Sequence, residues 1–148
     1  MILNLTQHTP SIDQMMEGVG DPTREHREKI HALLTFDNIP TLADMERRAE
    51  ELANIVESQE YTCDTIAGGV GCGDAMIGGA PYFMPVLERV LLSRGITVHY
   101  AFSVRNVVER HGGEKTSVFR HVGFYTVRPT RAPIDYGDED EWGNRCET

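Results

Sequence analysis

Three groups of residues suited to binding a phosphate follow short apolar segments of the sequence. They are Thr6, Gln7 and His8 after the run ILNL, Gly78 and Gly79 after Ala75–Ile77, and Ser103 and Arg105 after the run that begins at Ile96. An imidazole can act as a general acid or base near neutral pH. A guanidinium bonds two phosphate oxygens at once, and backbone amides at a glycine turn bind anions. If the strands that precede them are neighbours, the three groups share one edge of the sheet and form a small-anion site there.

A purely structural role is an alternative for each group. His8 could bond the backbone at a turn, and the two glycines could only permit a tight connection. Arg105 and the surrounding basic charges could be solvated on a hairpin, the commoner fate of such side chains. The residue types and their spacing leave both interpretations open.

The segment that must position these groups is 75–105, which reads as strand, glycine turn, helix and strand. Pro81 is expected to open the helix, and Gly95 to close it. Apolar side chains recur on one helical face at Phe83, Leu87, Val90 and Leu91. Such a crossover is right-handed and joins parallel strands. The glycines then lie at the carboxyl edge of the sheet, where open α/β sheets bind ligands.

The remaining segments extend this unit into one α/β domain. We expect a first strand at 1–6, helices opened by capping signals at Ser11, Asp21–Pro22 and Thr41, and a hairpin with arms at 106–110 and 115–127. His121, on the second arm, could reach the same edge. The predicted fold is a Rossmann-like three-layer sandwich with a mainly parallel sheet and a C-terminal antiparallel hairpin. The domain is expected to span 1–128, followed by an acidic, flexible tail at 129–148, while the glycine-rich segment 67–73 is expected to be a mobile loop.

Composition narrows the classes of partner. The formal net charge of −9 argues against a protein that coats long nucleic acids, and the only basic stretch, 95–130, suits a small polyanion. No run of about 20 apolar residues predicts a membrane span, and no signal peptide is evident. The three cysteines lack metal-binding spacing, so we expect a cytoplasmic protein with neither a metal nor another cofactor.

The glycine turn after a strand, with the start ILNLTQHT and the finish YAFSVRNVVE and KTSVFRHVGF, resembles small stand-alone CRISPR-associated proteins with CARF domains. The resemblance covers the first strand and residues 75–127. CARF domains are Rossmann-fold sensors of cyclic oligoadenylate, and several relatives are ring nucleases that linearise it. The resemblance implies that the chain binds a cyclic oligonucleotide and cleaves it without metal, using the ligand's own 2′-hydroxyl as nucleophile. It also implies that His8 is the general acid or base and that Arg105 binds the phosphate. In this sequence Ala80–Tyr82 replaces the usual Thr-Lys after the glycines.

The sequence leaves three functions open. The first is a ring nuclease that dampens antiviral signalling, and the second a binding protein that sequesters the messenger without cutting it. The third is an unrelated nucleotide-binding protein, suggested by the fold alone. A twofold-symmetric ring suits a homodimer, with a hairpin or helix surface beside the crevice as its interface.

Overall fold

A computed structural model describes residues 1–58 and 73–130 of the chain. Its five-stranded sheet has the order β2-β1-β3-β4-β5. The strands are β1 (Ile2–Leu5), β2 (Val19–Gly20), β3 (Asp74–Ile77), β4 (Thr97–Glu109) and β5 (Lys115–Val127). The first four are mutually parallel, and β5 runs antiparallel to β4. The glycine-rich loop and the tail beyond residue 130 lie outside the described residues, apart from Gly73.

Four helices connect the strands: α1 (Ile12–Met16), α2 (Arg24–Leu34), α3 (Leu42–Val56) and α4 (Met84–Ser93). Side-chain caps fix where three of them begin. At α2 the Thr23 hydroxyl accepts a hydrogen bond from the His26 amide, one residue after the expected signal at Asp21–Pro22. Ser11 and Gln14 form a complete capping box on α1, and Thr41 accepts a hydrogen bond from the Asp44 amide on α3. The chain is therefore α/β, as expected, with a mostly parallel sheet and an antiparallel β4–β5 hairpin.

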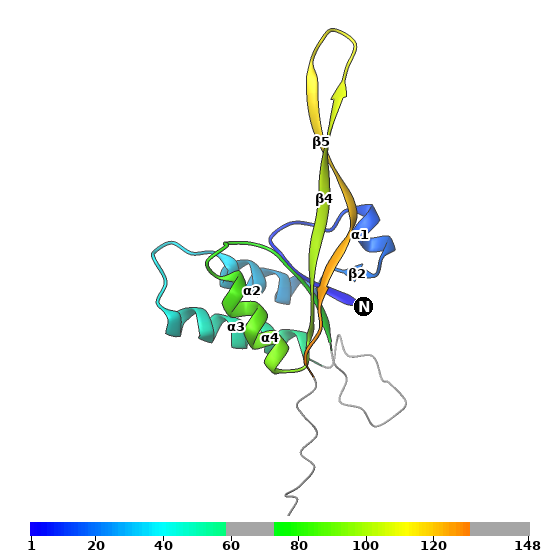
Figure 1. Cartoon of the computed structure of the whole chain (residues 1–148). Coiled ribbons are helices and arrows are strands. Elements are labelled where there is room, and N and C mark those ends of the chain that lie inside the picture. Colours follow the sequence, from blue (N-terminus) through cyan, green and yellow to red (C-terminus); the bar gives the residue numbers. More distant parts are fainter. Residues whose placement is uncertain (59–72, 131–148) are drawn as a thin grey trace, which may run out of the picture.

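The hydrophobic core lies between the sheet and one helical layer. Leu3, Leu5, Ala75, Ile77 and Val98 point from the sheet into a cluster with buried residues of α2, α3 and α4. Figure 1 shows these three helices on one side of β4 and β5, with the short α1 on the other. This arrangement follows from right-handed crossovers, in which the direction of a connection along the sheet decides which face its helix covers. The connection from β1 to β2 runs one way, and those from β2 to β3 and from β3 to β4 run the other way.

The α4 stripe is buried as predicted, since Phe83, Leu87 and Leu91 have no exposed surface and Val90 has 7%. The start of the helix differs from expectation. Pro81 lies in a turn in which the Ala80 carbonyl accepts from the Phe83 and Met84 amides, and α4 begins at Met84. The first turn of α4 is therefore separated from the glycine pair by a turn of chain.

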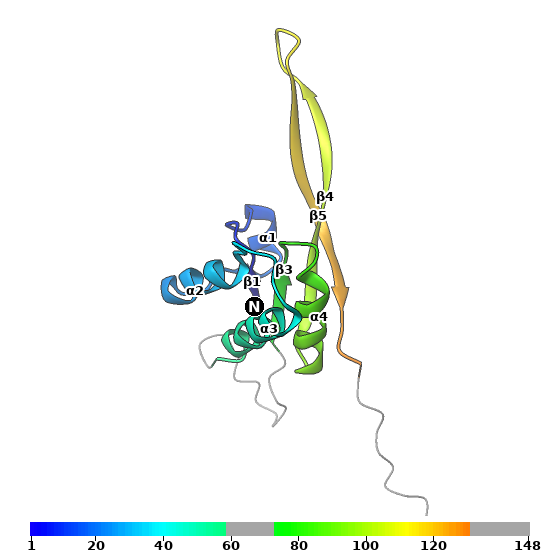
Figure 2. The same ribbon diagram turned by 90° about the vertical axis from the view of Figure 1, so that its left-hand side faces the viewer.

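The β4–β5 hairpin is longer than predicted and projects from the body as a twisted two-stranded arm (Figures 1 and 2). The expected end of a strand at Phe102 is wrong, because β4 continues to Glu109 and pairs with β5 from Val98 to Glu109. A register shift between Phe102 and Ser103 marks a bulge in this pairing. The short strand β2 was also not expected. No helix in the described ranges has the length and apolar character needed to cross a membrane.

Candidate functional site

The strand register determines which residues meet at the carboxyl edge of the sheet. Leu5 pairs with Ile77, and Ile77 with Tyr100. The residues beyond these positions surround a cavity of about 340 Å³, here called the crevice. Its lining consists of Thr6, Gln7, His8, Thr9, Gln14, Met76, Ile77, Gly78, Gly79, Tyr100 and Ala101. The structure thus brings the first two predicted groups together.

A buried asparagine holds the loop that carries His8. Asn4 is 1% exposed, and its amide nitrogen donates to the His8 carbonyl at 2.8 Å and to Asp21 Oδ1 at 2.9 Å. Its amide oxygen accepts from the Thr6 amide at 3.0 Å and from Thr6 Oγ1 at 2.7 Å. Every polar atom of this buried side chain is paired, so the loop after β1 is held in one conformation.

The His8 side chain is exposed at the crevice. Within residues 1–58 and 73–130 its imidazole has no hydrogen-bond partner, while its backbone is held by Asn4 and Thr6. An imidazole that makes no internal bond can exchange a proton with a bound molecule. This arrangement suits the predicted acid–base role of His8, which stays a prediction.

The hydrogen bonds of the Thr6 and Gln7 side chains go to neighbouring protein groups. The Thr6 hydroxyl donates to Asn4 Oδ1 and lies 3.1 Å from the His8 carbonyl. Gln7 Nε2 donates to Thr35 Oγ1 at 2.9 Å, which ties the crevice wall to the end of α2. Their side chains therefore position the loop, and their remaining surface faces the cavity.

The glycine pair forms the opposite wall of the crevice. Gly79 has φ +156°, a conformation that side-chain-bearing residues rarely adopt. Gly78 has no such requirement, and a Cβ built there would lie 3.5 Å from Thr6 Cγ2, an ordinary contact. Gly79 is thus required by the backbone, whereas Gly78 keeps the space beside Thr6 open.

The third predicted group and His121 lie outside the crevice. Ser103 and Arg105 lie within β4, beyond Ala101, where the crevice ends, and Arg105 Nε donates to Ser117 Oγ at 2.9 Å. The His121 side chain is 3% exposed, and its Nε2 lies 3.0 Å from Glu17 Oε1. It joins β5 to the end of α1. The expectation that Ser103 and Arg105 follow a strand end was wrong, because pairing with β5 continues β4 past Phe102 to Glu109.

Tyr100 is the residue that sequence reasoning missed. It lines the crevice and also a second cleft, of about 720 Å³, that contains Gly78, Gly79, Glu88 and Arg89. Its hydroxyl donates to Glu88 Oε2 at 2.5 Å. Burial, followed by the hydrogen bond to Glu88, raises the pKa of the Tyr100 phenol above its ordinary value. The pairing of Tyr100 with Ile77 places Tyr100 at the crevice, but the sequence does not show that pairing. The apolar run around Tyr100 indicated only a buried strand.

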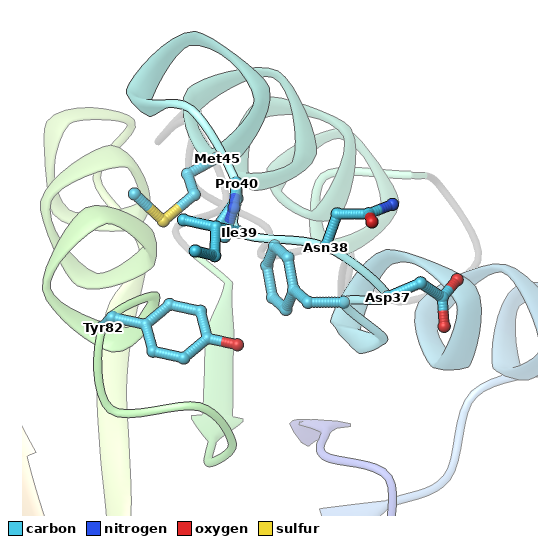
Figure 3. A pocket seen from close by; sticks show the side chains of 7 residues that line it. Asp37, Asn38, Ile39, Pro40, Met45 and Tyr82 are labelled. Carbon is cyan, nitrogen blue, oxygen red and sulfur yellow. The ribbon is translucent and has the colours of Figure 1, made fainter.

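A third cleft, of about 770 Å³, lies where the α2–α3 and β3–α4 loops face each other. Figure 3 shows Tyr82 on one side and Asp37 on the other, with Ile39, Pro40 and Met45 between them. The Phe36 ring meets the Tyr82 ring edge-on, with centroids 5.5 Å apart. The wall of this cleft is therefore mainly apolar.

The described residues contain no group of three or more His, Cys, Asp and Glu side chains arranged to hold a metal ion. The crevice lining also includes no Lys or Arg from these ranges. Among the described residues, a bound anion would therefore meet the glycine segment and His8 rather than a guanidinium.

One family model, described as "Uncharacterized protein MJ1673 family", matches residues 1–125. The chain therefore belongs to this family. The matched residues include the crevice, the four parallel strands and nearly all of the β4–β5 arm. No curated protein and no solved structure matches the chain.

Proposed function

We propose that the crevice binds one nucleotide unit of a small cyclic oligonucleotide of the cyclic oligoadenylate class, and that His8 assists its linearisation without metal. The observation that carries the proposal is the placement of two groups across one cavity at the carboxyl edge of a mainly parallel sheet. They are the glycine pair and the exposed His8 imidazole, which has no partner in the part of the chain that the structure describes. The volume of about 340 Å³ is at the small end of ligand sites, so a ring would need a second copy for its other half. A homodimer is thus part of this proposal, as is a Rossmann-like, CARF-like fold.

The chemistry needs little from the protein. The 2′-oxygen attacks the neighbouring phosphorus while the bond from phosphorus to the 5′-oxygen breaks. The products are a 2′,3′-cyclic phosphate and a free 5′-hydroxyl, so the proton lost by the 2′-hydroxyl ends on the 5′-oxygen. In this proposal the His8 imidazole moves that proton, and backbone amides of the glycine segment contact the phosphate oxygens.

A second candidate is a binding protein that holds the ring intact. It is favoured by the lack of Lys or Arg among the described residues of the crevice lining, because cleavage develops negative charge that a guanidinium would stabilise. Binding alone places no such demand on the site.

The test is incubation with cyclic oligoadenylates of several ring sizes in the presence of a chelator, followed by chromatography and titration calorimetry. Linear product supports the nuclease, and an intact ring recovered after heat denaturation supports the sequestering protein. If no ring size binds, the proposed function is wrong.

Three variants relate the result to the site. His8→Ala should slow cleavage by about 100-fold or more with affinity retained, and the exposed arm-tip His111→Ala is its matched control. Gly78→Ala adds a methyl group beside Thr6 and should weaken binding by about tenfold. Arg105→Ala should leave affinity unchanged if each crevice acts alone; a loss would mean that the arm of a second copy supplies this guanidinium.

A further inference from the structure

One face of the β4–β5 arm continues the core face of the sheet beyond the helices that cover it. Strand alternation places Phe102, Val104 and Val108 on the side of Val98 and Tyr100. Cross-strand pairing adds Val118, opposite Asn106, and Tyr125, opposite Tyr100. These five residues (Phe102, Val104, Val108, Val118 and Tyr125) form the apolar arm face.

The apolar arm face is open in a single copy. Phe102 is 58% exposed and Tyr125 69%, while Val108 and Val118 are each nearly half exposed. The arm is a two-stranded ribbon, and both views show it extending away from the helical layer (Figures 1 and 2). Isolated two-stranded hairpins are marginally stable in water, so a ribbon of this length is expected to gain stability from a covering surface.

The opposite arm face is more polar and is satisfied in part within one copy, although the buried His121 Nδ1 has no hydrogen-bond partner among the described residues. Glu109 pairs with Lys115 across the strands, and Arg105 bonds Ser117. At its base, the bond between His121 and Glu17 brings α1 against this face. Phe119, 71% exposed, is the large aromatic residue that remains open there. Val107 is also 61% exposed on this opposite face. The two faces therefore differ in extent, because the apolar arm face has two exposed aromatic residues and the opposite face has one.

We propose that the apolar arm face packs against the same face of a second copy of this chain. A twofold contact requires a surface complementary to itself, with a projection and a recess on the same face. Gly123 pairs with Phe102, and a Cβ built on it would meet no atom within 4 Å. The open space at Gly123, between Phe102 and Tyr125, is a recess suited to an aromatic ring from the other copy.

The size of the apolar arm face suits such a contact. A fully covered aromatic side chain buries about 150–250 Å². A standard interface buries about 800 Å² on each partner. The two exposed aromatic residues and three valines supply roughly half of that area, and their polar neighbours supply the rest.

Charge also favours a second copy over a nucleic acid. Within residues 97–127 Arg105, Arg110, Lys115 and Arg120 stand against Glu109 and Glu114, a net charge of only +2, whereas the whole chain carries −9. Nucleic-acid affinity depends on many phosphate contacts by Lys and Arg, and the arm has few to offer. In a twofold contact the arm meets the arm of the second copy, and a net charge of only +2 on each gives little repulsion.

The test is the mass of the full chain measured by sedimentation and light scattering across the micromolar range, without nucleotide. We expect about twice the 16.6 kDa of one chain. Phe102→Ser and Tyr125→Ser should each raise the dimer dissociation constant about 30-fold or more, as truncation of a buried aromatic anchor does. Phe119→Ser, on the other face of the same ribbon, is the matched control and should leave the dimer intact.

Circular dichroism separates loss of contact from loss of fold, because Phe102→Ser and Phe119→Ser remove the same strand-favouring side chain. A wild-type mass near 16.6 kDa throughout, or equal dissociation of both phenylalanine variants, overturns the proposal. A mass that rises only when RNA is added also overturns it. This inference shares the expectation of a homodimer with the proposed function, so a monomeric wild type would remove that part of both. Calorimetry with cyclic oligoadenylate measures binding at the crevice separately and so distinguishes the two failures.

Discussion

His99 Nε2 lies 2.9 Å from Asp74 Oδ1, across the pairing of β3 with β4. The other ring nitrogen of His99 lies 2.9 Å from Thr126 Oγ1 on β5. One imidazole thus connects three adjacent strands on the face of the sheet opposite the helical core. The arm is continuous with two of these strands, so the bond anchors its base to the body.

Asp74→Ala should lower the free energy of unfolding by about 1–2 kcal/mol, because the His99 N–H then loses its acceptor while the ring stays mostly covered. Asp74→Asn keeps an oxygen acceptor and should cost less. Urea unfolding of the two variants checks this order. Equal stability of wild type and Asp74→Ala would show that the bond contributes nothing to the anchoring of the arm.

The Asn4 network should be the most sensitive polar group of the crevice. Asn4→Leu leaves the Thr6 amide and the Asp21 carboxylate without their buried partner, so we expect a loss of about 2–4 kcal/mol. Thr9→Ala is the control, because the Thr9 hydroxyl makes only an exposed 3.3 Å bond with Arg27. Chemical denaturation measures both, and a loss for Asn4→Leu no larger than that for Thr9→Ala would contradict the assignment.

Much of the scaffold could be predicted from local signals. The capping box at Ser11, the cap at Thr41 and the apolar stripe of α4 are formed by neighbouring residues, and the structure confirms all three. Strand β2 could not be predicted in this way, because two residues at Val19 and Gly20 show no period and pair only through β1. A local sequence pattern can identify a helix, because its hydrogen bonds form within the segment. It cannot identify a short strand whose hydrogen bonds all go to another strand.

The site was predictable in part for the same reason. His8 and Gly78 each follow a short strand that ends where its apolar residues end, so topology alone placed them at one edge. Arg105 was misplaced because β4 does not end with its apolar run; pairing with β5 continues it as an arm. Tyr100 was missed because its importance comes from register with Ile77, which depends on a neighbouring strand.

Tyr100 should make the free energy of unfolding depend on pH in alkaline solution. Its pKa is raised by burial and by Glu88, so its phenol should ionise after the exposed tyrosines in an absorbance titration. The unfolded chain ionises near the ordinary tyrosine pKa of about 10, so the unfolded state loses this proton first and the free energy of unfolding falls as the pH rises above that value. Below about pH 10 this contribution is fully present.

Tyr100→Phe removes the titrating group and should flatten this alkaline fall, at the cost of the bond to Glu88 at neutral pH. Tyr82→Phe, on a side chain that is 54% exposed and outside the proposed dimer contact, is the control and should leave the pH profile unchanged. Thermal melts from pH 8 to about pH 11 make the comparison. Identical profiles for Tyr100→Phe and wild type would show that the phenol is not held in its protonated form by the fold.

The two glycines of the crevice should respond differently to the same small change. Gly79→Ala forces a side chain onto a backbone at φ +156°, with its Cβ 3.4 Å from Met84 Cε, so we expect a loss of about 1–3 kcal/mol from backbone strain. Gly78→Ala meets only an ordinary contact with Thr6 and should change stability by less than about 1 kcal/mol, while it narrows the crevice. Denaturant unfolding measures the first effect and calorimetry with cyclic oligoadenylate the second. A Gly78→Ala variant that is as unstable as Gly79→Ala would mean that both glycines are kept for the turn, and that the space beside Thr6 is not reserved for a ligand.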